Sequence, residues 1–427
     1  MTMNEFDRVQ ALTYDENDDL KDFRQRFYLP DSNLVYLDGN SLGLMPAKTP
    51  LHLQHVLEYE WGQRQIRSWN EGWYNRPSEI ASKIAHLIGA QEDEVVVADS
   101  TSVNLFKLAW AALRYRAEKK TIVSDELNFP SDIYIFQGLQ DAFGGQHNLR
   151  LAKSADGITV SMEELERCMG SDCALLSLSY VLFKSAFMYD MKAVTRLAHQ
   201  KGAMVLWDLS HATGAVSVDL NACQADLAVG CTYKYLNGGP GAPAFLYVRK
   251  DLQEKLFSPV QGWFGQHKPF DFSLQYDAAP GIKRFMAGTP PVLSLSALDT
   301  SLDILGEAGM DRIREKSLRQ TRYLIELFEK YLKNLGFELG SPDQDRFRGS
   351  HVAMRHPEAY RICQALIDPA VGTKTVIPDF RDPDVIRIGI APLYNTFEEI
   401  LESVVQMELI VANQLYEKFP VQRNAVT

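Results

Sequence analysis

The chain has 427 residues, of which 46% are hydrophobic and 23% charged, a composition typical of a globular protein with room for two domains. Its 44 basic and 55 acidic residues give a net charge of −11, and no basic run is longer than pairs such as Lys119-Lys120, which argues against a nucleic-acid surface. No stretch approaches the roughly 18 consecutive apolar residues of a membrane helix, so we expect no membrane partner.

The N-terminal residues and the cysteines favour a cytoplasmic protein. Residues 1–20 are polar and acidic, with neither the apolar core of a signal peptide nor the Arg-rich pattern of a transit peptide. The five cysteines are scattered and form no C-x-x-C pair; they are Cys168, Cys173, Cys223, Cys231 and Cys363. We therefore expect a reducing compartment, no disulfide framework and no metal site.

Short apolar runs alternate with helical patterns through the middle of the chain. The runs that we predict as strands are 95–97, 121–123, 174–176, 204–207, 227–229 and 244–248. Continuously apolar strands separated by helices, such as one over Met191–His199 that stops at Gly202, are typical of a mostly parallel α/β sheet covered on both faces. The last two strands flank the short turn Asn237–Gly241, and this close spacing suits an antiparallel pair.

The pattern changes after about residue 305. A helical repeat of leucines ends at Gly336, and in 385–389 Arg387 lies on the strand face opposite the isoleucines. An amphipathic helix over Glu398–Tyr416 is expected to close a small α+β domain. The predicted organisation is an N-terminal segment packing with the small domain (1–55), a large domain (56–305) and the small C-terminal domain (306–427).

Two charged residues follow neighbouring predicted strands. Asp208 ends one strand, and Lys234 comes after the next, ahead of the glycine-rich turn Asn237–Gly241. Ligands of open α/β sheets collect at this edge, and an Asp and a Lys there suit pyridoxal 5'-phosphate (PLP) chemistry. The lysine would bind the cofactor and the aspartate its pyridine nitrogen. A structural ion pair is the alternative. A P-loop is excluded, because the glycines of a P-loop precede its lysine, whereas here they follow Lys234.

A phosphate site is expected at the start of a helix near residue 103. Ser100, Thr101 and Ser102 combine hydroxyl groups with the free N–H groups of a helix N-terminus, which together bind anions. The alternative is a plain helix N-cap, which serine and threonine commonly provide.

Several longer segments resemble kynureninases, in matching order from about residue 25 to 410. They are 37–44 (LDGNSLGL), 129–132 (FPSD), 205–211 (VLWDLSH), 232–247 (TYKYLNGGPGAPAFLY), 262–263 (GW), 288–291 (GTPP) and 387–394 (RIGIAPLY). The resemblance implies an α/β enzyme of PLP fold type I, within the class-V aminotransferase superfamily, acting as a homodimer with shared active sites. It also implies hydrolytic Cβ–Cγ cleavage of L-kynurenine to anthranilate and L-alanine, a reaction of tryptophan catabolism.

The resemblance assigns cofactor roles to ten residues. Lys234 is similar to the Schiff-base lysine that also acts as a base, Asp208 to the pyridine partner, and Phe129 to the ring stacked on the cofactor. The residues expected around the phosphate are Thr101, Ser102, Tyr233 and Trp263, with Thr289 from the neighbouring subunit. Asp132 and His211 match residues near the cofactor ring, and Tyr233 also matches the proton donor to the cleaved substrate.

On the substrate side, the resemblance assigns three residues. Arg387 resembles the arginine that binds the α-carboxylate, for which a planar guanidinium offers two parallel hydrogen bonds. Trp69 matches an aromatic position beside the aryl group, and Ser41 is expected near that same end. Thr289, where other members have Asn, goes with unsubstituted kynurenine.

One stretch departs from the family pattern. After the strand that ends near residue 178, kynureninases usually read H-V-N-Y-x-T-G, whereas this chain has Tyr180, Leu182 and Phe183 at the His, Asn and Tyr positions. Because lost polar groups can change specificity, the alternative function is a kynureninase-like lyase or class-V aminotransferase acting on another amino acid.

Three other classes are disfavoured. A cysteine desulfurase needs a mobile cysteine, whereas Cys363 lies in a packed-helix pattern. A Ser-His-Asp hydrolase would show a G-x-S-x-G elbow, which is missing. A binding protein without catalysis would be expected to lack Lys234 or Asp208.

Overall fold

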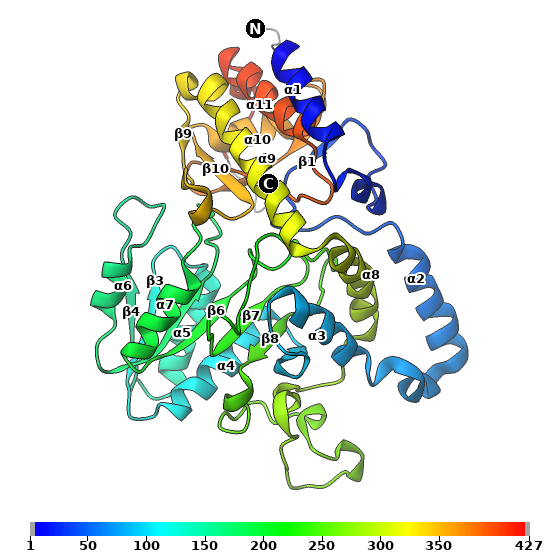
Figure 1. Cartoon of the computed structure of the whole chain (residues 1–427), viewed down its shortest axis with the longest axis vertical. Helices are drawn as coiled ribbons and strands as arrows, with labels where there is room; N and C mark the ends of the chain where they lie inside the picture. Colours follow the sequence, from blue (N-terminus) through cyan, green and yellow to red (C-terminus); the bar gives the residue numbers. More distant parts are fainter. Residues whose placement is uncertain (1–4, 423–427) are drawn as a thin grey trace.

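The structure is a computed structural model that describes residues 5–422. Figure 1 shows a large body around a seven-stranded sheet and a smaller body, formed by the two ends of the chain, above it. Residues 1–4 and 423–427, at the outer limits of the predicted N-terminal segment and small domain, lie outside the described range. Within residues 5–422, no helix is both long enough and apolar enough to cross a membrane.

The large sheet has the strand order β2-β8-β7-β6-β5-β3-β4. The strands are β2 (Val95–Val97), β3 (Thr121–Asp125), β4 (Asn148–Ala152), β5 (Cys173–Ser179), β6 (Met204–Asp208), β7 (Leu227–Gly230) and β8 (Phe245–Val248). Neighbouring strands are parallel, except that β8 runs antiparallel to β2 and β7. The mostly parallel mixed sheet and its antiparallel last pair are therefore confirmed.

Helices cover both faces of this sheet. On one face lie α4 (Thr101–Tyr115) and α5 (Pro130–Ala142), and on the other lie α3 (Arg76–Leu87), α6 (Met162–Cys168), α7 (Met191–Gln200) and α8 (Val292–Ala308). Successive side chains of a strand point to opposite faces, so Leu206 packs in the α4/α5 core and Val205 in the other. This two-sided burial explains the continuously apolar strands.

The small domain contains a four-stranded antiparallel sheet of order β12-β13-β10-β9. Its elements are α9 (Met310–Leu327), β9 (Glu338–Leu339), β10 (His351–Arg355), α10 (Ala359–Ile367), β12 (Asp379–Arg381), β13 (Val385–Gly389) and α11 (Phe397–Ala412). Ile386 and Ile388 enter its core, and Arg387 lies on the opposite face, as predicted. The predicted closing helix is too long, because Gln414 adopts a left-handed conformation and only a separate turn follows.

The N-terminal segment contacts both bodies. Helix α1 (Glu5–Glu16) packs against α11, and β1 (Leu34–Tyr36) pairs in parallel with β11 (Thr375–Ile377). Helix α2 (Thr49–His55) instead packs against α8. We propose the division into an N-terminal segment, a large domain and a small domain with the limits given above.

Candidate active site

The site lies at the carboxyl edge of the large sheet. Asp208, the last residue of β6, is paired in register with Ser179, the last residue of β5, and Lys234 follows the end of β7. Asp208 Oδ1 accepts hydrogen bonds from the backbone N–H (2.8 Å) and the hydroxyl (2.6 Å) of Ser210. The hydroxyl of Ser179 donates to Asn128 Oδ1 at 2.6 Å. The parallel strands thus bring these polar groups together at one edge.

The side chain of Lys234 points to a buried histidine and two aromatic rings. Lys234 Nζ lies 2.9 Å from Nε2 of His211, and 6.0 Å and 5.8 Å from the ring centroids of Phe129 and Tyr233. Phe129 precedes helix α5 and is 44% exposed, so one part of its ring is open to a ligand. Four residues predicted for the cofactor site therefore share one neighbourhood.

Burial sets the charge balance around the lysine. Burial raises the pKa of Asp208, although Ser210 and Lys234 act in the opposite direction. Burial also raises the pKa of Asp132 well above its ordinary value, and the charge of Asp208 adds to this effect. Burial, and then the Lys234 charge, lower the pKa of His211 well below its ordinary value. Two buried carboxyl groups beside a neutral imidazole favour a cationic or N–H-bearing ligand.

Buried polar atoms without a hydrogen-bond partner lie at this edge. They include Oδ2 of Asp132 and Nδ1 of His211. Buried polar groups are normally paired, so their presence beside Lys234 indicates that a polar ligand completes the site.

The expected phosphate site lies where helices α4 and α5 begin. Ser100 is the N-cap of α4, and Ser102 Oγ lies 3.1 Å from Ser131 Oγ at the start of α5. Thr101 and Ser102 are half buried, so both residues keep part of their surface exposed. Two adjoining helix N-termini with hydroxyl groups favour an anion.

Arg387 is the centre of a second polar cluster, on the small-domain sheet. Its guanidinium is fully buried and bonds the carboxylate of Asp379, the hydroxyl of Ser41 (2.8 Å) and the carbonyl of Phe183 (2.5 Å). With its amide oxygen facing the arginine, Asn40 also accepts from Nε at 2.8 Å. Ser41 therefore lies beside the arginine that the resemblance assigns to the carboxylate end of the substrate, and not at the aryl end where we expected it.

Trp69 and Trp263 form a separate aromatic cluster. Both pack against Phe264, with ring centroids 6.0 Å and 4.6 Å away, and Trp263 is 42% exposed. Thr289 is exposed as well. Within residues 5–422, none of these three side chains forms a hydrogen bond, an ion pair or a ring contact with Lys234.

The three departures from the family pattern differ in their surroundings. Leu182 is fully buried in the core, and Tyr180 packs on that core with its ring 5.9 Å from Trp207. Only Phe183 reaches the site, because its ring lies 5.2 Å from that of Phe129 and its carbonyl binds Arg387. Two of the three exchanges are therefore changes of core packing.

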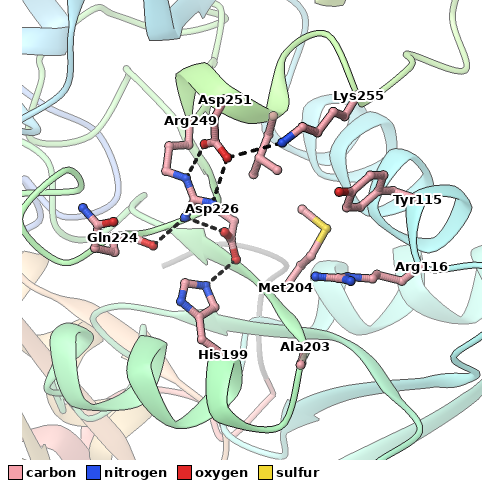
Figure 2. A pocket seen from close by; sticks show the side chains of 12 residues that line it. Tyr115, Arg116, His199, Ala203, Met204, Gln224, Asp226, Arg249, Asp251 and Lys255 are labelled. Atoms are coloured by element: carbon pink, nitrogen blue, oxygen red, sulfur yellow. Dashed lines mark hydrogen bonds and ion pairs between the residues drawn. The ribbon is translucent and has the colours of Figure 1, made fainter.

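A polar pocket of about 560 Å³ lies at the opposite, amino edge of the sheet (Figure 2). At its centre Asp226 accepts from the backbone N–H of Val205 and pairs with His199 and Arg249, each at 2.8 Å. These polar groups already satisfy one another, so we assign this network to the stability of the strand edge.

Several residues of the site escaped sequence reasoning. Asn128, Ser179 and Ser210 hold the Asp208 edge, and Asp379 holds Arg387. Ser179 could have been found, because it ends a predicted strand as Asp208 does. Asp379 could not, since only the β12–β13 register places it opposite Arg387.

Solved structures with the same fold define the class of protein. A cysteine desulfurase from Thermococcus onnurineus NA1 superposes with a TM-score of 0.79 at 18% identity, covering 92% of this chain and 98% of its own. A C-DES mutant with glycine covalently linked to its PLP cofactor gives 0.77 at 16% identity, covering 89% and 99%. The fold is therefore that of the fold-type-I PLP enzymes.

Sequence comparison then gives the family. Kynureninase from Pseudomonas fluorescens is 42% identical over 402 residues, covering 93% of this chain and 94% of the relative. Kynureninase from Burkholderia mallei (strain SAVP1) is 40% identical with the same coverage. Residues 313–407 match the kynureninase C-terminal domain. The chain belongs to the kynureninase family.

Proposed function

We propose that the protein hydrolyses the Cβ–Cγ bond of L-kynurenine to give anthranilate and L-alanine. The observation that carries this proposal is the position of Lys234 at the carboxyl edge, beside Asp208 and His211, in a member of the kynureninase family. L-kynurenine is an α-amino acid with an aryl ketone, so the site must bind a carboxylate, an amine and an aromatic ring.

The cofactor is pyridoxal 5'-phosphate. The unpartnered buried atoms beside Lys234 fit a polar heterocycle, and the paired starts of α4 and α5 fit its phosphate. Asp208 and Asp132 would hold the ring nitrogen side, His211 the ring, Phe129 its face, and Thr101 and Ser102 the phosphate. When bound, PLP supplies an electron sink for charge that develops at the substrate carbons.

Two side chains move protons in this proposal. The amine of Lys234 takes the proton from Cα of the substrate, and its contact with His211 Nε2 keeps it directed toward the ring site. Burial raises the pKa of the Tyr233 phenol, so the hydroxyl stays protonated and donates to Cβ after the bond breaks.

The α-carboxylate binds to Arg387. Asp379, Ser41, Asn40 and Phe183 already use most of the guanidinium donors, so the substrate must replace at least one partner to gain two parallel hydrogen bonds. Asp379 can be retained by Arg381, whose Nη2 lies 2.9 Å from its Oδ2.

A homodimer would complete the aryl and phosphate ends of the site. Trp69, Trp263 and Thr289 have no described contact with Lys234 within one chain. Large apolar side chains are exposed along the helical region around α2 and at the start of α8. They include Leu51, Trp61, Ile66 and Leu293. An exposed apolar surface of this kind favours a second copy, and Thr289 would then reach the phosphate of the partner subunit.

We assign the protein to the cytoplasm and to tryptophan breakdown. All five cysteines are free thiols, as expected in a reducing compartment. Thr289 favours unsubstituted kynurenine over its 3-hydroxy derivative as the substrate.

A second candidate is cleavage of a different amino acid, favoured by the contact of Phe183 with Phe129. The test compares L-kynurenine, 3-hydroxykynurenine and other aryl-substituted amino acids with the PLP-loaded protein, following fluorescent anthranilate and alanine. We expect fastest release of anthranilate from kynurenine. Turnover of another substrate, with none for kynurenine, would favour the second candidate.

A further inference from the structure

His351 is a buried histidine that none of the roles above uses. It is the first residue of β10 and is paired in register with Gly389 of β13. Because alternate residues of a strand share a face, His351 lies on the same face of the small-domain sheet as Arg387 and Asp379. Glycine at position 389 makes room for the side chain of Asn40, whose amide also contacts Arg387.

The side chain of His351 is fully buried, yet neither ring nitrogen makes a hydrogen bond of normal geometry. A buried imidazole without partners is costly, and such groups in native proteins call for a ligand or ordered water.

His351 lies between the cluster around Lys234 and the cluster around Arg387. Its ring centroid is 5.6 Å from that of His211, whose Nε2 contacts Lys234. On the other side, the carbonyl of Phe183 that accepts from Arg387 also attracts the N–H of the His351 imidazole, and this interaction raises the pKa of His351. Imidazole and guanidinium therefore approach the same carbonyl.

The charge state of His351 follows from its burial. Desolvation lowers its pKa well below the ordinary value, and the charges of Arg387 and Lys234 add to this effect. The ring is thus neutral at pH 7, with one N–H donor and one acceptor nitrogen.

We propose that His351 is a substrate-binding residue that donates one hydrogen bond to the α-carboxylate held by Arg387. The proposal rests on the proposed function, because it requires an α-amino acid that extends from Lys234 to Arg387. The carboxylate has more acceptor sites than the partly occupied guanidinium can fill, and the neutral imidazole supplies a further donor without adding charge. A water bridge between His211 and His351 is the competing, purely structural explanation.

The experiment compares His351→Phe and His351→Gln in the full-length, PLP-loaded protein. Phenylalanine fills the space but cannot donate, whereas glutamine retains an N–H donor. His147→Phe is the matched control, because His147 is also buried with both ring nitrogens unpartnered, yet it packs against Phe143, beyond the C-terminal end of α5. Arg387→Gln is the positive control for loss of carboxylate binding.

Two ligands separate carboxylate binding from a general disturbance: L-kynurenine and the amine obtained from it by removing the carboxyl group. KM is measured for kynurenine, and the dissociation constant of the amine is taken from the change in visible cofactor absorbance. We expect His351→Phe to raise KM for kynurenine about 10-fold or more. We expect the affinity of His351→Phe for the amine to stay nearly unchanged. We also expect the midpoints of unfolding of His351→Phe and His147→Phe to be nearly equal.

His351→Gln is expected to restore most of the kynurenine affinity. Equal weakening of both ligands by His351→Phe, or no rescue by glutamine, would overturn the proposal in favour of the structural water bridge. Failure of the proposed function is seen separately, because the unmodified protein would then release no anthranilate.

Discussion

Lys234 Nζ and His211 Nε2 lie 2.9 Å apart, although the two residues belong to loops after different strands. The register of β5, β6 and β7 produces this contact, because it aligns their carboxyl ends at one edge of the sheet. Burial, and then the Lys234 charge, lower the pKa of His211, so its ring is neutral and Nε2 accepts from the lysine side chain.

Replacing Lys234 with alanine should abolish turnover. The variant lacks the amine that binds the cofactor and takes the Cα proton, so we expect kcat to fall by at least about 1,000-fold. The fall is measured as anthranilate release, together with loss of the visible absorbance of the lysine-bound cofactor. Full activity in Lys234→Ala would contradict the site. Lys107→Ala is not a suitable control, since Lys107 pairs with Asp99 in the core.

Asp208→Asn should lower kcat while the cofactor still binds. The amide preserves the shape of the side chain but removes the buried negative charge that would stabilise a protonated cofactor ring. We therefore expect kcat to fall about 100-fold or more. Asp208→Glu, which keeps the charge, should retain more activity than the amide. Parallel assays of anthranilate release and of cofactor content distinguish lost chemistry from lost binding.

Arg387→Lys should weaken substrate binding. Lysine keeps the charge but loses the planar pair of donors, so KM for kynurenine should rise about 10-fold or more. Ser41→Ala, which removes one bond to the guanidinium, should raise KM by a smaller factor. Steady-state kinetics measure both, and an unchanged KM in Arg387→Lys would exclude this arginine as the carboxylate site.

Asp38 should make stability depend on pH. Burial, and then the charge of Asp379, raise its pKa from 3.8 to about 6, so the folded protein holds this proton more tightly than the unfolded chain. The free energy of unfolding should therefore fall by up to about 3 kcal/mol from this group as pH rises from about 4 to 7. Asp38→Asn should flatten that dependence in denaturant unfolding. The same change in the free energy of unfolding with pH in the unmodified protein and in Asp38→Asn would contradict the assignment.

Leu182→Asn, which restores the residue type usual in kynureninases, should destabilise the fold without changing specificity. Leu182 is fully buried among apolar side chains, so an amide there costs about 2 kcal/mol or more. Chemical denaturation measures the loss. Phe183→Tyr, at the one departure that contacts Phe129, is the variant in which KM should change. A changed substrate preference in Leu182→Asn would refute the packing explanation.

The sequence predicted the strands that are buried on both faces, because continuous apolar runs mark them. It did not predict β4, an edge strand whose residues are largely exposed or half buried and therefore carry no apolar run. Closing helix α11 ends early for a local reason, the left-handed Gln414, which the apolar periodicity does not reveal.

The site was predictable to the extent that its residues follow strands or stand in family motifs. Asp208, Lys234 and Arg387 follow a predicted strand, stand in a family motif, or both. Asp379 and His351 met neither, because they join Arg387 only through the pairing of β10 and β12 with β13, which distant sequence positions do not show.

The most direct test of the central claim locates the cofactor on the chain. Borohydride reduction of the PLP-loaded protein fixes the cofactor to the lysine that carries it, and mass spectrometry of the peptides identifies that lysine. We predict the added mass on the peptide that contains Lys234, with simultaneous loss of anthranilate release from kynurenine. Modification of any other lysine, with Lys234 unmodified and activity lost, would contradict the account.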